Sequence, residues 1–177
     1  AAFLNFVITD IKNYFEKTLQ RSLQEIDLSL FTSYLTLDAG INEGKNEVQF
    51  LFVYDKESRH LQHCQPSDLQ EELNGVAFQS PYGEFSFAGV PSEGMVSRED
   101  LFMDLLSVVS DSVDVKRMIV VSFNEEYGKK VTDVLQGLKG KEVMQFRMNE
   151  PEIPVNYKWD MLAFPVMHSL GIRAEEL

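Results

Sequence analysis

A strand, a helix and a second strand within residues 118–148 constrain the fold of this chain most strongly. Residues 118–123 form a continuous apolar run, which is typical of a strand buried on both faces. Residues 125–138 have helical periodicity and end at Lys139 and Gly140, and residues 142–148 form a further strand. Two strands joined by a helix pair in parallel through a right-handed crossover. The sequence therefore predicts a βαβ unit in this part of the chain.

The first 26 residues predict an amphipathic helix. Steps of three and four residues separate the apolar side chains Leu4, Val7, Ile11, Phe15, Leu19, Leu23 and Ile26. Phe3 and Phe6 lie partly off this stripe and widen the apolar surface. Such a helix is buried in its own domain or shared with a partner, so we expect Phe3 and Phe6 to be candidate contact residues in a homodimer.

Between residues 28 and 110 the sequence alternates short strands with two helices. Patterning and turn residues predict strands at 28–37, 47–54 and 59–65, a short helix at 66–73, strands at 76–79 and 84–88, and a helix that Ser97 caps. The first three strands are expected to form an antiparallel meander. The order of the first eight elements resembles that of the small acidic chaperones of type III secretion systems over residues 3–110, without a shared residue motif.

The predicted fold class is α+β, in the order α-β-β-β-α-β-β-α-β-α-β-α, with a final helix near residues 160–170 that contains Pro165. We expect one domain over residues 1–177, with a mixed, mostly antiparallel sheet and helices packed on it. A division into an acidic meander part, 1–115, and a βαβ-α part, 116–177, stays open. The alternation of Tyr157, Trp159 and Met161 also allows an extended segment there. The residues expected in the core are Phe50, Phe52, Leu105, Leu106, Ile119, Val121 and Leu135.

The charge of the chain is strongly uneven. It has 28 acidic and 16 basic residues, for a net charge of −12, and residues 60–115 hold ten acidic residues and one basic residue. This balance argues against nucleic-acid binding, which needs clustered lysine and arginine. It favours a protein partner with a basic surface, although an acidic face can also serve solubility alone. The expected contact residues are Glu71, Glu72, Glu93, Glu99, Asp100 and Asp104.

Motifs for catalysis and cofactors are missing from the sequence. The turn at residues 123–128 carries Glu125 and Glu126 instead of a glycine-rich phosphate loop, and no P-loop sequence occurs. His60, His63 and Cys64 form an H-x-x-H-C group without the paired spacing of a zinc site. We therefore expect no cofactor, no metal and no catalytic residue.

No apolar run is long enough to span a membrane or has the pattern of a signal peptide, and the single cysteine fits a reducing compartment. A cytoplasmic protein without membrane contact is expected.

The sequence favours a non-catalytic acidic protein-binding module, adaptor or chaperone-like, that self-associates. One alternative is an acidic immunity or inhibitor protein that covers a basic site on a toxin or nuclease. Another is a small enzyme or ligand-binding domain, whose first candidate residues are His63, Cys64, His168, Tyr127 and Asp160.

Overall fold

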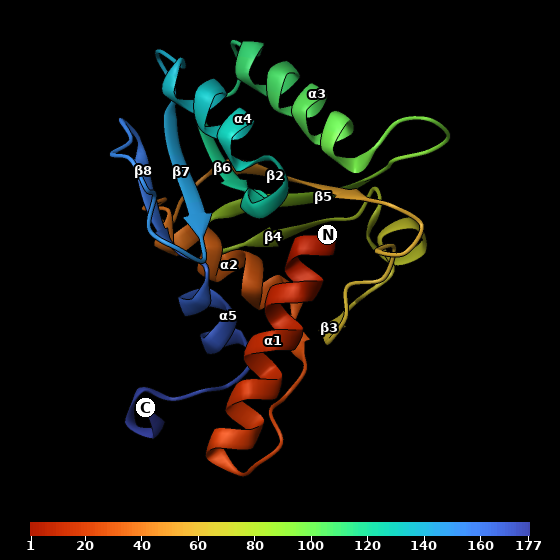
Figure 1. Cartoon of the computed structure of the whole chain (residues 1–177), viewed down its shortest axis with the longest axis vertical. Helices are drawn as coiled ribbons and strands as arrows, with labels where there is room; N and C mark the ends of the chain where they lie inside the picture. The colour runs from red at the N-terminus through yellow and green to blue at the C-terminus, as the bar shows by residue number, and fades with distance from the viewer. The chain divides into compact units, whose positions relative to one another are not determined.

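The computed structural model describes all 177 residues and confirms the α+β class. The chain forms two compact units (Figure 1). Unit 1 comprises Ala1–Ser92 and Phe164–Leu177, and unit 2 comprises Glu93–Ala163. The strands form three sheets, with the orders β1-β3, β2-β5-β4 and β6-β7-β8.

The predicted N-terminal helix is present but shorter than expected. Helix α1 spans Ala2–Leu19 and ends at Gln20, whose backbone is left-handed with a φ of 53°. Leu4, Val7 and Ile11 are buried, as the stripe predicts, and Ile8, which lies off the stripe, is buried as well. The later apolar residues of the stripe, Leu23 and Ile26, are buried too, but they follow the helix instead of extending it.

The strand predicted at residues 28–37 is wrong, because Leu28–Asp38 is helix α2. Its buried residues, Leu28, Phe31, Thr32, Leu35 and Thr36, follow the three- and four-residue steps of a helix. The hydroxyls of Thr32 and Thr36 donate to the carbonyls of residues 28 and 32, so these β-branched residues bury no unpaired polar atom. Asp27 caps the helix by accepting a hydrogen bond from the Ser29 backbone amide, at 3.0 Å.

The main sheet of unit 1 is built from β2 (Asn46–Tyr54), β4 (Ala77–Ser80) and β5 (Gly83–Pro91). Strands β4 and β5 form the predicted hairpin, and β2 pairs with β5 in parallel. At the start of β5, Gly83 has a φ of 126°, and a Cβ there would lie 1.9 Å from the carbonyl oxygen of Asn46. Only glycine fits this approach.

One face of this sheet is aromatic. Phe50 packs edge-on against Phe85, with ring centroids 5.1 Å apart, and Phe78 stacks with Phe87 at 5.6 Å. The opposite face carries exposed polar residues such as Glu47, Gln49 and Glu84. The alternation of the two faces follows from the period of two along each strand.

The antiparallel meander is wrong because its first strand is helix α2 and most of its third strand does not form. Only Cys64–Gln65 is a strand, β3, which pairs in parallel with β1 (Ile26–Asp27). The left-handed backbone of His63, with a φ of 61°, interrupts an extended course through residues 59–65. Without that strand the predicted element order and its chaperone-like pattern both fail.

A polar contact orders the loop that replaces this strand. Arg59 donates two hydrogen bonds to the carboxylate of Asp68, at 2.9 and 2.7 Å. The same carboxylate caps the short π-helical turn η1 (Leu69–Leu73) by accepting from the backbone amides of Gln70 and Glu71. The arginine holds the pKa of Asp68 well below its usual range.

Unit 2 contains the predicted βαβ unit. Strand β6 (Arg117–Val121), helix α4 (Asn124–Gln136) and strand β7 (Glu142–Arg147) follow one another, and β6 and β7 are parallel. Strand β8 (Lys158–Met161) adds in parallel to β7, and helix α3 spans Arg98–Asp111. Among the strands, only β4 and β5 pair antiparallel, so the expectation of a mostly antiparallel sheet is wrong.

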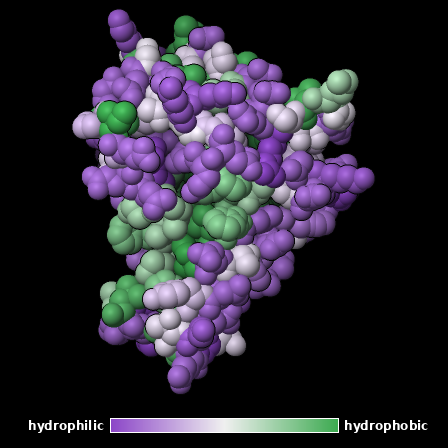
Figure 2. All heavy atoms as spheres, in the orientation of Figure 1, coloured by the Kyte–Doolittle hydropathy of each residue, from purple (hydrophilic) through white to green (hydrophobic).

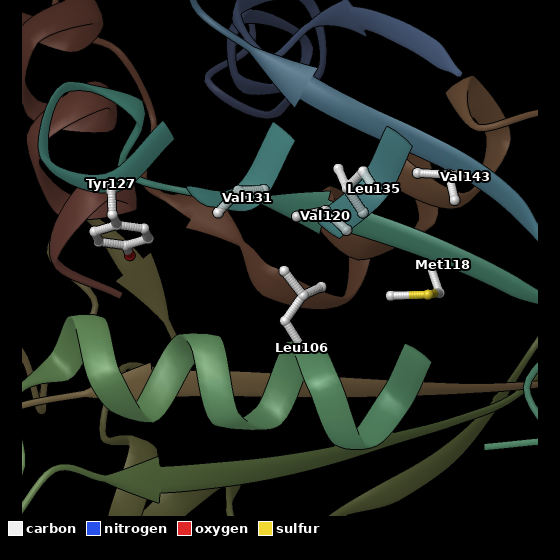
Figure 3. Close-up of a cluster of buried hydrophobic side chains, with 7 residues drawn as sticks. All are labelled: Leu106, Met118, Val120, Tyr127, Val131, Leu135 and Val143. Carbon is white, nitrogen blue, oxygen red and sulfur yellow. The ribbon is translucent and has the colours of Figure 1, made fainter. Parts of the chain in front are cut away.

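The core of unit 2 lies between its sheet and both helices. Leu106 of α3 points toward Val120 and toward Tyr127, Val131 and Leu135 of α4 (Figure 3). Among the expected core residues, Leu106 and Leu135 are buried, whereas Phe50, Phe52, Leu105, Ile119 and Val121 are half-buried. Ile119 and Val121 lie on the face of β6 opposite Met118 and Val120, which form the core, and an apolar run does not show which face of a strand is covered more deeply.

The chain ends in two short helices that belong mainly to unit 1. Helix α5 (Ala163–Ser169) has Pro165 in its first turn, where the missing amide hydrogen costs no helical hydrogen bond. The 3₁₀-helical turn η2 (Ala174–Glu176) follows. Arg21, just beyond α1, donates two hydrogen bonds of 2.8 Å to the Glu176 carboxylate and so ties this turn to the first helix.

Candidate functional site

Helix α3 begins where the sequence places its cap. The Ser97 hydroxyl oxygen accepts a hydrogen bond from the Asp100 backbone amide at 3.1 Å, and Glu99 and Asp100 occupy the positive end of the helix. Leu106 is buried on the inner side, and Phe102, Met103 and Val109 pack against the same core. This packing fixes which side of α3 faces outward.

The outward side carries an acidic face. Asp100, Asp104 and Asp111 are all exposed, and their spacing of four and seven residues places them on one side of the helix. No lysine or arginine forms an ion pair with any of them. Val108, 66% exposed, lies beside them. We call these four residues the α3 acidic face.

The other charges of α3 are already paired with α4. Glu99 accepts a hydrogen bond from Lys130 at 2.6 Å, and Arg98 donates to Glu126 at 2.6 Å. The Glu99 carboxylate raises the pKa of Lys130, which keeps this lysine charged. Glu99 therefore joins the two helices, whereas Asp100 forms no hydrogen bond or ion pair with Lys130 and only adds to its raised pKa through its charge.

The remaining acidic candidates do not extend this face within unit 2. Glu93 is exposed at the start of unit 2, in the loop before α3. Glu71 and Glu72 belong to η1 of unit 1. Glu72 accepts a hydrogen bond from the Asp68 amide at 3.2 Å, and Glu71 lies 3.9 Å from Arg59. The acid-rich segment of the sequence is thus divided between two units.

The two aromatic candidates of α1 have different environments. Phe3 is buried, so it belongs to the core. Phe6 is 60% exposed, on the same outer side as the exposed Tyr14. Of the pair, only Phe6 is accessible to a partner.

The candidate residues for an enzyme are distributed over both units. Cys64 is buried, and this burial raises the pKa of its thiol to about 12, so the nucleophilic thiolate is disfavoured. His168 packs against Tyr34 at 5.4 Å, and His63 lies in the loop before β3. These three residues belong to unit 1.

The other two enzyme candidates, Tyr127 and Asp160, belong to unit 2. Tyr127 is a core residue whose pKa is raised by burial, and Asp160 accepts a hydrogen bond from the Met161 amide at 2.7 Å. His60 lies 3.7 Å from the Asp68 carboxylate in unit 1.

Sequence reasoning missed a polar cluster at the carboxyl edge of the unit 2 sheet. Gln145 is fully buried on β7. The Oε1 atom of its side chain accepts hydrogen bonds from the Arg147 guanidinium and the Tyr157 hydroxyl, both at 3.0 Å. Its amide donates to Ser122 at 3.4 Å, and Ser122 donates to the side chain of Asn124 at 2.6 Å. The signal in the sequence is a glutamine between the apolar residues Val143, Met144 and Phe146 of a parallel strand. The cluster connects β7 with the residue after β6, the residue before β8 and the first residue of α4, and every member has a partner.

The structure contains neither a candidate metal cluster nor a candidate membrane-spanning helix. No group of three or more histidine, cysteine, aspartate or glutamate side chains could hold a metal ion. None of the helices combines the length and the apolar character needed to cross a membrane. In Figure 2, hydrophilic residues cover most of the visible face, with hydrophobic residues in smaller groups among them.

Comparison with known proteins places the chain in a family but gives no further relative. No curated protein and no solved structure matches the chain. A sequence model of a protein family matches residues 1–177. The chain therefore belongs to the family of unknown function DUF6621.

Proposed function

We propose that this protein is a non-catalytic, acidic protein-binding module, adaptor or chaperone-like, that binds a partner with a basic surface on the α3 acidic face. The observation that carries the proposal is the contrast along α3. Glu99 and Arg98 are paired with α4, whereas Asp100, Asp104 and Asp111 share an exposed side and form no ion pair. A cytoplasmic location is part of the proposal, on the cysteine count alone.

The charges of this face suit a partner with lysine or arginine at matching spacing. Each exposed ion pair contributes about 0.2–1 kcal/mol to an interaction, so several pairs are needed for useful affinity. Like-signed carboxylates on one rigid helix also attract a cationic partner over distance and raise the association rate. Val108 adds an apolar contact within the face.

Capture of partners from an extract of the source cells at low salt tests this proposal. The D100N/D104N variant removes two carboxylates of the face without changing side-chain size. If each lost pair is worth about 0.2–1 kcal/mol, affinity for the captured partner falls roughly twofold to thirtyfold. The same partner, once purified, is titrated against both proteins to measure this change.

The E125Q/D133N variant is the matched control. It removes two exposed carboxylates from α4 of the same unit and leaves the α3 acidic face intact. The proposal is wrong if the partner is lost equally from both variants, or if no protein binds the wild type at low salt. An acidic inhibitor of a basic active site would use the same face, and an activity assay of the captured partner separates the two roles.

A further inference from the structure

The main sheet of unit 1 has an open edge along β2. In the order β2-β5-β4, no strand pairs with the outer side of β2, which is nine residues long. The Tyr54 carbonyl accepts from the Ser92 amide, and the Asn46 amide donates to the Tyr82 carbonyl, so the even-numbered residues of β2 face β5. The backbone groups of the odd-numbered residues, Glu47 to Val53, therefore point to the open edge.

The backbone groups at the open edge are unpaired at three of the four positions. Glu47, Gln49 and Leu51 are exposed, and their amides and carbonyls have no partner beyond the edge. The carbonyl of Val53 accepts a hydrogen bond from the amino nitrogen of Ala1 at 2.8 Å, so this position is occupied. Strand β2 contains one charged residue, Glu47, and neither proline nor glycine. It thus lacks most of the devices that protect edge strands from pairing.

The aromatic face of the sheet is less covered at this edge than at its centre. Phe85 and Phe87 on the central strand β5 are buried, at 0% and 4% exposure. Phe50 and Phe52 on β2 are only half-buried, although they lie on the same face. A further strand beside β2 would cover these two rings as β2 covers those of β5.

We propose that β2 is a self-association edge, where β2 of a second copy pairs antiparallel about a two-fold axis at Gln49. In this register Gln49 faces Gln49 of the second copy, and Glu47 faces the uncharged Leu51. The outward amides and carbonyls of the two β2 strands then lie opposite one another and can form hydrogen bonds between the copies. The two sheets join into one, and the interface is the same patch on each copy.

The charge of Glu47 and the occupied carbonyl of Val53 favour this register over the neighbouring ones. An axis at Glu47 would place two carboxylates directly opposite one another, which is unfavourable. An axis at Leu51 would place Gln49 opposite Val53, whose carbonyl is already bonded to Ala1. The axis at Gln49 avoids the first conflict, and it places only Lys45, which precedes β2, opposite the occupied Val53. The inference uses unit 1 and is independent of the α3 acidic face.

Sedimentation equilibrium of the full chain at increasing concentration tests the proposal. The wild type is expected to form dimers. In Q49K two lysines oppose one another at the axis, so the dimer dissociation constant rises about tenfold or more. The matched control is Q79K, which places the same charge on an exposed position of β4, on the same sheet face but at the opposite edge of the sheet.

Mixing variants makes the result independent of folding defects. Q49K and Q49E should each be weak dimers, and an equimolar mixture should form heterodimers, because opposite charges then meet at the axis. The proposal is overturned if the wild type stays monomeric at every concentration, if Q49K and Q79K dimerise equally, or if the mixture remains monomeric. Wild-type monomers that bind only foreign extended peptides at this edge would assign it to another partner and likewise overturn self-association.

Discussion

At the residue scale, single ion pairs tie distant parts of unit 1 together. Arg21 holds the Glu176 carboxylate with two hydrogen bonds, and the backbone amide of Arg173 donates a third, at 2.8 Å. These contacts lower the pKa of Glu176 from 4.5 to about 2, mainly through the bonds from Arg21. The folded structure favours the charged Glu176 carboxylate, so protonation of this group destabilises the fold.

The lowered pKa of Glu176 predicts acid sensitivity. The stabilisation is complete above the unfolded pKa of 4.5 and is lost as the pH falls toward about 2. We expect E176Q to unfold at lower urea concentration than the wild type at about pH 7. The difference between the two urea midpoints should become smaller at about pH 3. E175Q is the control, because Glu175 is 70% exposed. A gap that stays constant with pH would contradict the assignment.

At the element scale, α4 depends on one glycine near its start. Tyr127 has non-helical backbone angles that separate the first turn from the rest of α4 and place its ring in the core, 5.4 Å from that of Phe102. Directly after it, a Cβ on Gly128 would lie 2.9 Å from the Cβ of Asn124. Alanine, which ordinarily favours a helix, would therefore force the two turns apart.

Alanine is predicted to have opposite effects at two glycines of this helix. G128A should destabilise the protein, because the contact with Asn124 outweighs a helix-propensity gain of about 1 kcal/mol. G137A at the end of α4 has its nearest neighbours at 3.6 Å and an ordinary φ of −82°, so it should stabilise by about 0.4–1 kcal/mol. Urea unfolding of both variants measures the difference. If both variants change the free energy of unfolding equally, the contact between residue 128 and Asn124 does not prevent an alanine at position 128.

At the scale of the whole molecule, net charge opposes self-association and favours a basic partner. Unit 1 has 15 acidic and 7 basic residues, and unit 2 has 13 and 9, so both units are negative. Two copies that meet at β2 repel one another over distance, whereas a cationic partner at α3 is attracted. Screening by salt weakens both effects.

The two proposed interactions should therefore respond to salt in opposite directions. Between about 0.1 M and about 1 M salt, the Debye length falls from about 10 Å to about 3 Å. The dimer dissociation constant should fall over this range, and the dissociation constant for the basic partner should rise. Sedimentation and titration of the same preparation measure both. A dimer that weakens with salt would point to an interface held by opposite charges, in conflict with a register that pairs Gln49 with Gln49 and Glu47 with Leu51.

Prediction from the sequence succeeded where a local pattern has one structural solution. The crossover from β6 through α4 to β7 follows from an apolar strand, an amphipathic helix and a second strand, because parallel strands need such a connection. The cap at Ser97 and the hairpin of β4 and β5 are equally local. For the candidate site, the sequence indicated Asp100 and Asp104, since the spacing of charges on a helix requires no tertiary information.

The features that only the tertiary structure decided depend on contacts between distant segments. Residues 28–37 suit a strand by composition, but burial of Leu28, Phe31 and Leu35 on one side makes them a helix. Glu99 and Asp100 are adjacent in sequence, yet only the position of Lys130 on α4 separates the paired carboxylate from the unpaired one. The open edge of β2 likewise exists because β5 returns beside it in parallel. Local sequence sets the periodicity of an element, whereas its partners, and hence its free surfaces, are set by the packing of the complete chain.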